Sequence, residues 1–377
     1  MPITMQECAE CGHETPSNDL CGNGRCANCC DDHCYSCGCD AHVTASNWCG
    51  NCDACHNCCE CSNSDEVAQP RGTTVFGTYH RMVDPLFFAH RCRKSEPLVG
   101  IEAEICTAQP AYATTPLQSS IQRWGMGCVH DGSLPSSGFE LQLPAANGKL
   151  LESMLAQLND ALTAQRATVD HRAGLHVHVD GRDWGWYDAR RLMLLWGIVE
   201  PEVMLGMPRS RRTSNFCVPV SDRYIEAITP NTPRRTSKAE VFRGIYSDSV
   251  RMRLSNGAIS RDHYNSARYV TLNMHSWVSR KTFEFRMHHG TTDGLTMRNW
   301  AQFCGKLVQF AYKTGETKLI QARDAAAANP AWIRKEVIKQ AVGGQLNDWW
   351  EARRSLLSAH PLWESGKSIA ASTVGLL

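Results

Sequence analysis

Apolar and polar residues alternate in five short runs of this chain: GIEAE (100–104), GFELQLP (138–144), GLHVHV (174–179), RYVTLN (268–273) and KTFEFR (281–286). Successive side chains of a β-strand point to opposite faces, so this spacing predicts strands with one apolar and one polar face. The polar positions hold three pairs, namely Glu102 with Glu104, His176 with His178, and Glu284 with Arg286. The runs therefore predict a sheet with carboxylates, imidazoles and a guanidinium group on one side.

The order of the expected elements favours an α+β fold. Strands are expected near 98–106, 123–130, 138–143, 174–180, 268–275 and 281–288, and helices near 149–166, 185–205, 238–250 and 293–313. Because the strands come in neighbouring pairs without a helix between each, an antiparallel sheet is favoured over a doubly wound parallel one. The stretch 206–236 combines arginines with prolines and is expected to be an irregular, functional loop.

Cysteine content and charge divide the chain into unlike parts. Fifteen of the twenty cysteines lie between Cys8 and Cys61, and residues 1–70 hold eleven acidic residues but one basic residue. The whole chain has a net charge of +1, so the remainder is strongly basic. We expect a Cys-rich module at 1–61, a linker at 62–97, a main domain at 98–314 and a helical C-terminal extension at 315–377.

Five Cys-x2-Cys pairs in the N-terminal module predict structural zinc. Each pair presents two thiolates to one tetrahedral ion, so two pairs complete a site, and folding of such a small module would depend on the metal. The first ten residues resemble no secretory signal, which favours a cytoplasmic protein with reduced thiols, although a disulfide scaffold is the alternative. The expected ligands are Cys8, Cys11, Cys26, Cys29, Cys34, Cys37, Cys49, Cys52, Cys55 and Cys58.

The distribution of charge also limits the partners. A strongly acidic module argues against nucleic acid, and no apolar run of about 18 residues is present to cross a membrane. The module is expected to bind a protein partner or present a substrate, with a purely structural cap as the alternative. The basic remainder suits an anionic ligand such as a nucleotide.

Clustered carboxylates beside two histidines predict a divalent-cation site. Any one run alone has an ordinary alternative, a strand face in water, but the shared pattern favours a site. Oxygen-rich sets with one or two imidazoles suit Mg²⁺ or Mn²⁺ better than Zn²⁺. Arg286, Arg268 and the Arg-rich loop are available for phosphate oxygens, whereas neither common glycine-rich phosphate loop is present. Cys217 is a weaker candidate, a nucleophile without an identifiable partner histidine.

Taken in order, the motifs resemble the amidoligase family, a branch of the superfamily that includes glutamine synthetase and glutamate–cysteine ligase. The resemblance covers about 98–314 and rests on GIEAE, HDGSLPSSGFELQLP, GLHVHV, SRRTSNFCVP, RYVTLNMHS and TFEFRMHHGTTD. It implies an antiparallel sheet with helices on one face, like the glutamine synthetase catalytic domain, that binds ATP and two divalent ions on its concave face.

Similarity to glutamine synthetase also implies roles for single residues. Glu102, His176 and Glu284 look like ligands of the ion that handles the transferred phosphate, and Glu104 and Glu140 look like ligands of the second ion. His178 corresponds to a position near substrate and phosphate. The arginines implied on the nucleotide phosphates are Arg286, Arg268 and Arg212, and Asn273 and Asp131 recur in the family pattern without a role that can be derived.

The reaction implied by the resemblance is ATP-dependent amide formation. A carboxylate attacks the γ-phosphorus, an acyl phosphate and ADP form, and an amine then displaces phosphate. The substrates would be a small-molecule or peptide carboxylate and an amine. Two alternatives stay open: a phosphotransferase, since guanidino kinases are related in fold, and a non-catalytic, zinc-scaffolded binding protein.

Overall fold

The computed structural model describes residues 97–107, 115–129, 131, 133–135, 137–182, 184–228 and 268–359, with four short strands near the N-terminus. The chain divides into two compact units: Met1–Gln69 with Ala227–Arg261, and Pro70–Glu226 with Asp262–Leu377. The main sheet belongs to the second unit. The short strands pair as β1 (Met5–Glu7) with β2 (Glu14–Pro16), and β3 (Trp48–Cys49) with β4 (Ala54–Cys55). Apart from the backbones of Cys49 and Cys55, the predicted zinc ligands lie outside the described residues.

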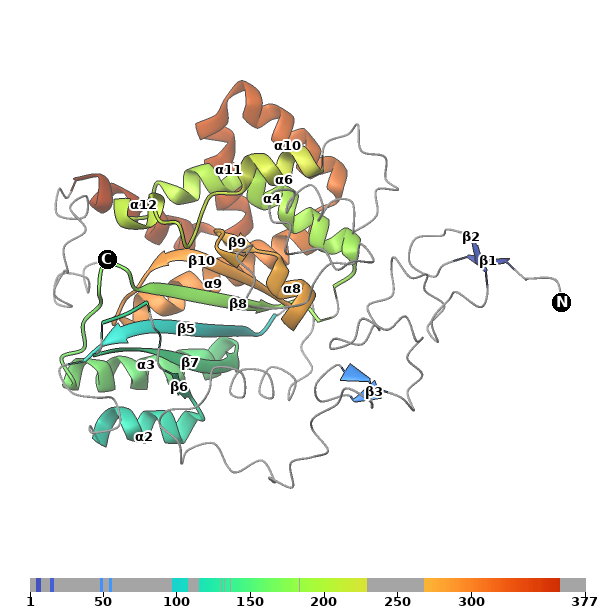
Figure 1. Cartoon of the computed structure of the whole chain (residues 1–377). Coiled ribbons are helices and arrows are strands. Elements are labelled where there is room, and N and C mark those ends of the chain that lie inside the picture. The colour runs from blue at the N-terminus through green and yellow to red at the C-terminus, as the bar shows by residue number, and fades with distance from the viewer. Residues whose placement is uncertain are drawn as a thin grey trace. The chain divides into compact units, whose positions relative to one another are not determined.

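Six strands form one antiparallel sheet in the order β6-β7-β5-β8-β10-β9 (Figure 1). Every strand pair in this sheet is antiparallel, so the expected α+β class with an antiparallel sheet is confirmed. The strands are β5 (Val99–Cys106), β6 (Gly127–Val129), β7 (Gly138–Ala146), β8 (Gly174–Asp180), β9 (Leu272–Asn273) and β10 (Thr282–His289).

Two strands are shorter than the sequence predicts. The expected strand at 123–130 begins only at Gly127, because helix α2 (Thr115–Trp124) precedes it and is followed by Gly125, whose φ is +62°. The expected strand at 268–275 shrinks to β9, because the chain enters helix α8 (His275–Arg280) directly afterwards. The residues before β9 pair instead with the Arg-rich segment, through a parallel bridge between Val218 and Val270.

The segment expected to be irregular contains two short helices, α5 (Arg209–Arg212) and α6 (Ser221–Ala227). Glu200 ties the start of α6 to the rest of the domain. Its carboxylate accepts hydrogen bonds from the backbone N–H groups of Val220 and Ser221 and from the Thr271 hydroxyl. The helix predicted at 238–250 lies outside the described residues.

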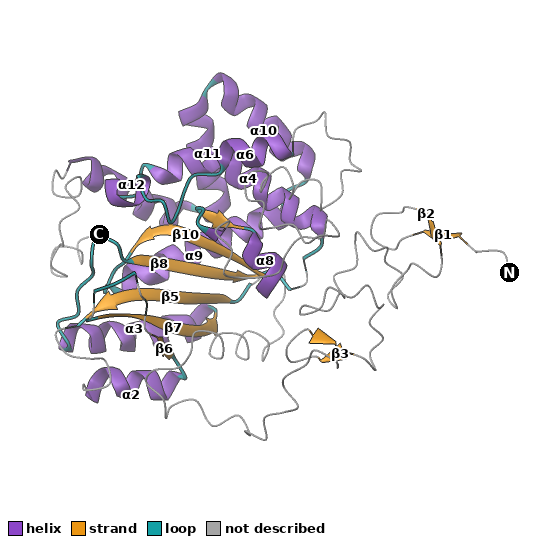
Figure 2. Ribbon diagram, viewed as in Figure 1, coloured by secondary structure: helices purple, strands orange, loops and turns teal. Residues whose placement is uncertain are grey.

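Helices cover the apolar face of the sheet (Figure 2). These are α3 (Gly148–Ala164), α4 (Trp186–Met204) and α9 (Gly294–Lys313). α9 packs on β5 and β8, and α3 packs on β7. Apolar strand residues such as Ile101, Val177 and Phe285 are fully buried there. The polar positions of the same strands consequently lie on the opposite face.

Three further helices pack on α4 and α9. They are α10 (Glu316–Ala328), α11 (Pro330–Val342) and α12 (Gly344–Ala359). Trp350 of α12 is buried between Trp300 and Phe303, at ring distances of 5.8 and 5.2 Å. Gly206 leaves room for it, since a Cβ there would lie 2.1 Å from the Trp350 ring. No helix in the described ranges is long and apolar enough to cross a membrane.

Next to Trp350, the buried Arg353 joins α12 to the end of β10. Its Nε donates to the Gly206 carbonyl at 3.2 Å, and its Nη2 lies 2.8 Å from His289 Nδ1. Burial lowers the pKa of Arg353 to about 9. Because α12 shares the aromatic core beneath the sheet, it contributes directly to the stability of the domain.

Replacing Trp350 with alanine is expected to lower the free energy of unfolding by about 3–5 kcal/mol, because it empties a closely packed aromatic site. Denaturant unfolding followed by circular dichroism measures this loss. Trp332 on α11 is the matched control, since it is 62% exposed and its replacement by alanine should change stability by less than about 0.5 kcal/mol. Equal losses in the two variants would contradict a core role for α12.

Candidate metal centre

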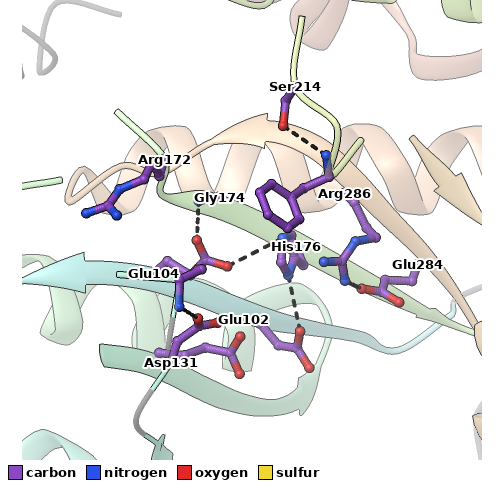
Figure 3. A network of polar contacts seen from close by, with 12 residues as sticks. Glu102, Glu104, Asp131, Arg172, Gly174, His176, Ser214, Glu284 and Arg286 are labelled. Carbon is purple, nitrogen blue, oxygen red and sulfur yellow. Dashed lines mark hydrogen bonds and ion pairs between the residues drawn. The ribbon is translucent and has the colours of Figure 1, made fainter. Parts of the chain in front are cut away.

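The strand register brings the polar runs together on one face. Glu102 lies opposite His176, Glu104 lies opposite Glu140, and Glu284 lies opposite both His178 and Asn273. Directly opposed residues of neighbouring strands share a face and have Cβ atoms about 4.5–5.5 Å apart. The polar side chains of four central strands therefore converge, and Figure 3 shows this for Glu102, Glu104, His176, Glu284 and Arg286.

One cluster of possible metal ligands consists of Glu102, His176 and Glu284. Each offers one ligand atom, and these atoms all lie within 4.8 Å of one another. His176 Nδ1 is 3.3 Å from Glu102 Oε2. His178 borders the cluster, with its Nε2 at 3.3 Å from Glu102 Oε1 and 3.8 Å from Glu284 Oε1. The cluster contains the three residues predicted for the first ion.

A second cluster consists of Glu104, Glu140 and the same His176, again with ligand atoms within 4.8 Å of one another. His176 Nε2 is 3.7 Å from Glu104 Oε1, so the two ring nitrogens of one imidazole face different carboxylates. Glu104 Oε2 accepts a hydrogen bond from Gly174 N at 2.6 Å. A Cβ on Gly174 would lie 2.8 Å from His176 Nε2, so a side chain there would displace the imidazole.

Electrostatics at this face favours a bound cation. Burial, together with the charges of Glu102 and Glu104, raises the pKa of Glu140 well above its usual range. Burial also opposes ionisation of Glu102, but His178 and His176 hold its pKa well below the usual range. Four buried carboxylates thus share one face, and Glu102 Oε1 has no hydrogen bond among the described residues. A divalent cation would satisfy these oxygens, so the donor set fits Mg²⁺ or Mn²⁺.

Neighbouring groups fix the orientation of Glu284. Asn273 Nδ2 donates to Glu284 Oε2 at 2.7 Å, and Arg286 Nη1 donates to Glu284 Oε1. Burial opposes ionisation of Glu284, but the charges of Arg286 and His178 lower its pKa to about 2. The carboxylate is therefore ionised at neutral pH and points in one direction.

The ring of His178 is held from its other side. Its Nδ1 lies 2.9 Å from Thr282 Oγ1, and that hydroxyl lies 2.8 Å from Ser276 Oγ. This arrangement leaves Nε2 facing Glu102 and Glu284. Arg280 adds a second guanidinium group, with Nη1 at 3.8 Å from Glu102 Oε1.

A β-bulge in β10 follows directly after Glu284. Phe285 lies opposite Val177, but His288 lies opposite Leu175, so β10 has one residue more than β8 over this stretch. Bulges of this kind are frequent next to active sites because they redirect side chains. Here Arg286 stays beside Glu284, whereas His288 turns to the helical side and packs on Trp300 at a ring distance of 5.1 Å.

The three predicted phosphate arginines occupy different surroundings. Arg286 contacts Glu284 of the first cluster. Arg268 connects to it through Tyr269, because the guanidinium groups of Arg268 and Arg286 lie 5.0 and 5.9 Å from the centre of the same ring. Arg212 lines a cavity of about 440 Å³ formed by α5 and α12, and no residue of the two clusters lines it.

In the Arg-rich segment, the arginine that lies next to the clusters is Arg211, the neighbour of Arg212. Arg211 is buried and donates to the carbonyl oxygens of Arg286 at 2.5 Å and Met287 at 3.4 Å. Cys217 is also buried, and its thiol donates to the Arg211 carbonyl at 3.2 Å. These contacts describe a structural anchor for the segment.

Sequence reasoning overlooked several residues that support the clusters. The strand alternation in GFELQLP could have identified Gln142, whose Nε2 donates to Glu140 Oε1 at 2.8 Å. Asp131 was noted without a role, and its charge adds to the rise in the pKa of Glu140. Thr282 shares the strand spacing of Glu284 and Arg286. Nothing in the sequence alone pointed to Arg280.

Comparison with known proteins agrees with this arrangement. A family model described as "Putative amidoligase enzyme" matches residues 99–308, which is more than half of the chain. The matched residues include the six-stranded sheet and both clusters. A search of curated proteins finds no match. The family model covers more than half of the chain and both clusters, so this chain belongs to the amidoligase family.

Proposed function

We propose that this chain is an ATP-dependent carboxylate–amine ligase that forms an amide bond through an acyl phosphate. Membership of the amidoligase family supports a ligase-type function in general. The observation that carries the rest is the meeting of two acid–histidine clusters at His176, with Arg286 paired to Glu284 of the first cluster. Paired divalent ions next to an arginine are what transfer of a phosphoryl group to a carboxylate requires.

In this proposal each cluster would hold one Mg²⁺ or Mn²⁺ ion. Glu102, His176 Nδ1 and Glu284 would bind the ion on the phosphoryl side, and Glu104 and Glu140 would bind the ion on the side of the carboxylate substrate. Because a neutral imidazole offers one lone pair to a metal, His176 Nε2 would keep its proton and orient Glu104. Bound ions would neutralise charge on the phosphoryl and carboxylate oxygens. The protein's contribution is a set of ligands already aligned by strand register and by the bonds from Asn273 and Gly174.

Arg286 and His178 would act on the substrates themselves. The guanidinium group of Arg286, oriented by Glu284, would donate to the phosphate oxygens as charge develops in the transition state. His178, with Nδ1 held by Thr282, would direct Nε2 toward the phosphate and the substrate carboxylate. Arg268 is a further candidate for the phosphates, through its position across Tyr269 from Arg286.

The remaining parts of the proposal concern the rest of the chain. We propose structural zinc and a protein-binding or substrate-presenting role for the Cys-rich module, in a cytoplasmic protein that binds neither nucleic acid nor membrane. The substrates would be a carboxylate and an amine, either small molecules or peptides.

The deciding experiment offers the full chain ATP, Mg²⁺ and pools of carboxylates and amines. We expect stoichiometric release of ADP and phosphate that requires both partners, with a condensed product detected by mass spectrometry. A phosphorylated product without phosphate release would identify a phosphotransferase instead. Failure to bind ATP in the presence of Mg²⁺ would favour the binding-protein alternative and contradict the ligase.

A further inference from the structure

Phe216 is an exposed aromatic residue close to the metal-binding face. Its side chain is 49% exposed, although the residue directly after it, Cys217, is completely buried. Single exposed hydrophobic residues are common and need no explanation by themselves. Two further observations, its rigid attachment and its neighbours, distinguish Phe216.

The segment that carries Phe216 is anchored on both sides. Phe216 N donates to Ser214 Oγ at 3.1 Å, a bond drawn at Ser214 in Figure 3. Val218 N then donates to the Tyr269 carbonyl at 3.0 Å, and Thr271 N donates to the Val218 carbonyl at 3.1 Å. The exposed ring is therefore presented in a fixed position, which limits the entropy lost when a ligand stacks on it.

The ring of Phe216 packs edge-on against Tyr269, with centroids 5.3 Å apart and an interplanar angle of 89°. Tyr269 in turn lies within cation–π distance of both Arg268 and Arg286. Arg286 contacts Glu284, a member of the first cluster. The ring of Tyr269 thus lies between Phe216 and Arg286, the arginine proposed to hold the phosphates.

We propose that Phe216, braced by Tyr269, is the surface on which the base of the bound nucleotide stacks. This inference rests on the proposed ATP-dependent function and extends it to the base end of the nucleotide. A nucleotide has a flat aromatic base at one end and anionic phosphates at the other. The contacts from Phe216 through Tyr269 to Arg286 and the carboxylate clusters present complementary groups in the same order.

The test compares two ligands, Mg²⁺–ATP and Mg²⁺–tripolyphosphate, by isothermal titration calorimetry on the full chain. Tripolyphosphate offers phosphate charge without a base. Replacing Phe216 with alanine should weaken ATP binding by roughly 5- to 100-fold, the range typical of one base stacked on one aromatic ring. Tripolyphosphate binding should be unchanged, and Phe216→Trp should retain ATP affinity.

Val218→Ala is the matched control, because Val218 is 37% exposed on the same segment and uses its backbone for the anchoring bonds. It should bind both ligands like the parent. Equal weakening of ATP and tripolyphosphate by Phe216→Ala, or no weakening of ATP, would overturn the stacking role while leaving the ligase proposal in place. A parent protein that binds neither ligand would overturn both.

Discussion

Replacing Glu284 with glutamine is expected to slow ADP formation by about 10²- to 10³-fold, the cost of losing one essential charge in a preorganised site. Glutamine keeps the volume of the side chain and one oxygen that can accept from Asn273. It removes the negative charge that pairs with Arg286 and that would coordinate the phosphoryl-side ion. Single-turnover measurement of ADP with saturating ATP and Mg²⁺ separates this effect from substrate binding.

Folding of the variant needs its own measurement, because the exchange removes the buried charge that Arg286 contacts. Thermal unfolding checks this directly. Glu284→Asp restores the charge with a shorter reach and should recover part of the rate. Glu336→Gln on α11, where the carboxylate accepts from Gln340 on the exposed surface, is the matched control and should react like the parent. Normal turnover in a folded Glu284→Gln protein would remove the metal hypothesis.

The second large effect concerns the number of ions bound. The parent is expected to bind two Mn²⁺ ions. Glu140→Gln should lose one ion, since Glu140 belongs to one cluster, whereas His176→Ala should weaken both, since its two ring nitrogens face the two clusters. Changes next to a metal commonly cost about 10- to 100-fold in affinity, and loss of a direct ligand should cost at least that much.

Mn²⁺ titration followed by electron paramagnetic resonance counts the ions without requiring any substrate. His171→Ala is the control, because the His171 side chain is 55% exposed and lies before β8, outside both clusters. It should bind two ions with parental affinity. If His176→Ala bound both ions with parental affinity, the imidazole would belong to neither site and the two-cluster arrangement would be wrong.

The two-residue spacing within a strand was sufficient to assign each acid and histidine to a face of its own strand. It was not sufficient to show which residues of different strands lie opposite each other. Glu102 and His176 are far apart in sequence, and their opposition depends on the register of β5 against β8, which packing of the whole apolar face determines. The resemblance to a known family supplied the grouping that local pattern could not. The geometry brings the residues of each predicted set together and places His176 beside the second set as well.

The errors have local causes. After RYVTLN the chain continues with MHS, and Asn273 Oδ1 accepts a hydrogen bond from Ser276 N where α8 begins. An asparagine just before a helix is a known helix-start signal, so it could have been used to shorten the predicted strand. Gly125 likewise marks the end of α2. The separation of Arg212 from the clusters could not have been foreseen, because adjacent residues point to different sides of a helical turn whose phase the sequence does not reveal.

The extra residue in β10 makes the length of this strand as important as its composition. Three positions separate Phe285 from His288, so regular alternation without the bulge would put them on opposite faces, and either Glu284 would rotate toward the helices or His288 would leave Trp300. A surface loop can absorb a change of register, but here closing the bulge would invert one half of the segment. Attempts to graft this centre onto another scaffold must therefore transfer the irregular spacing together with the residues.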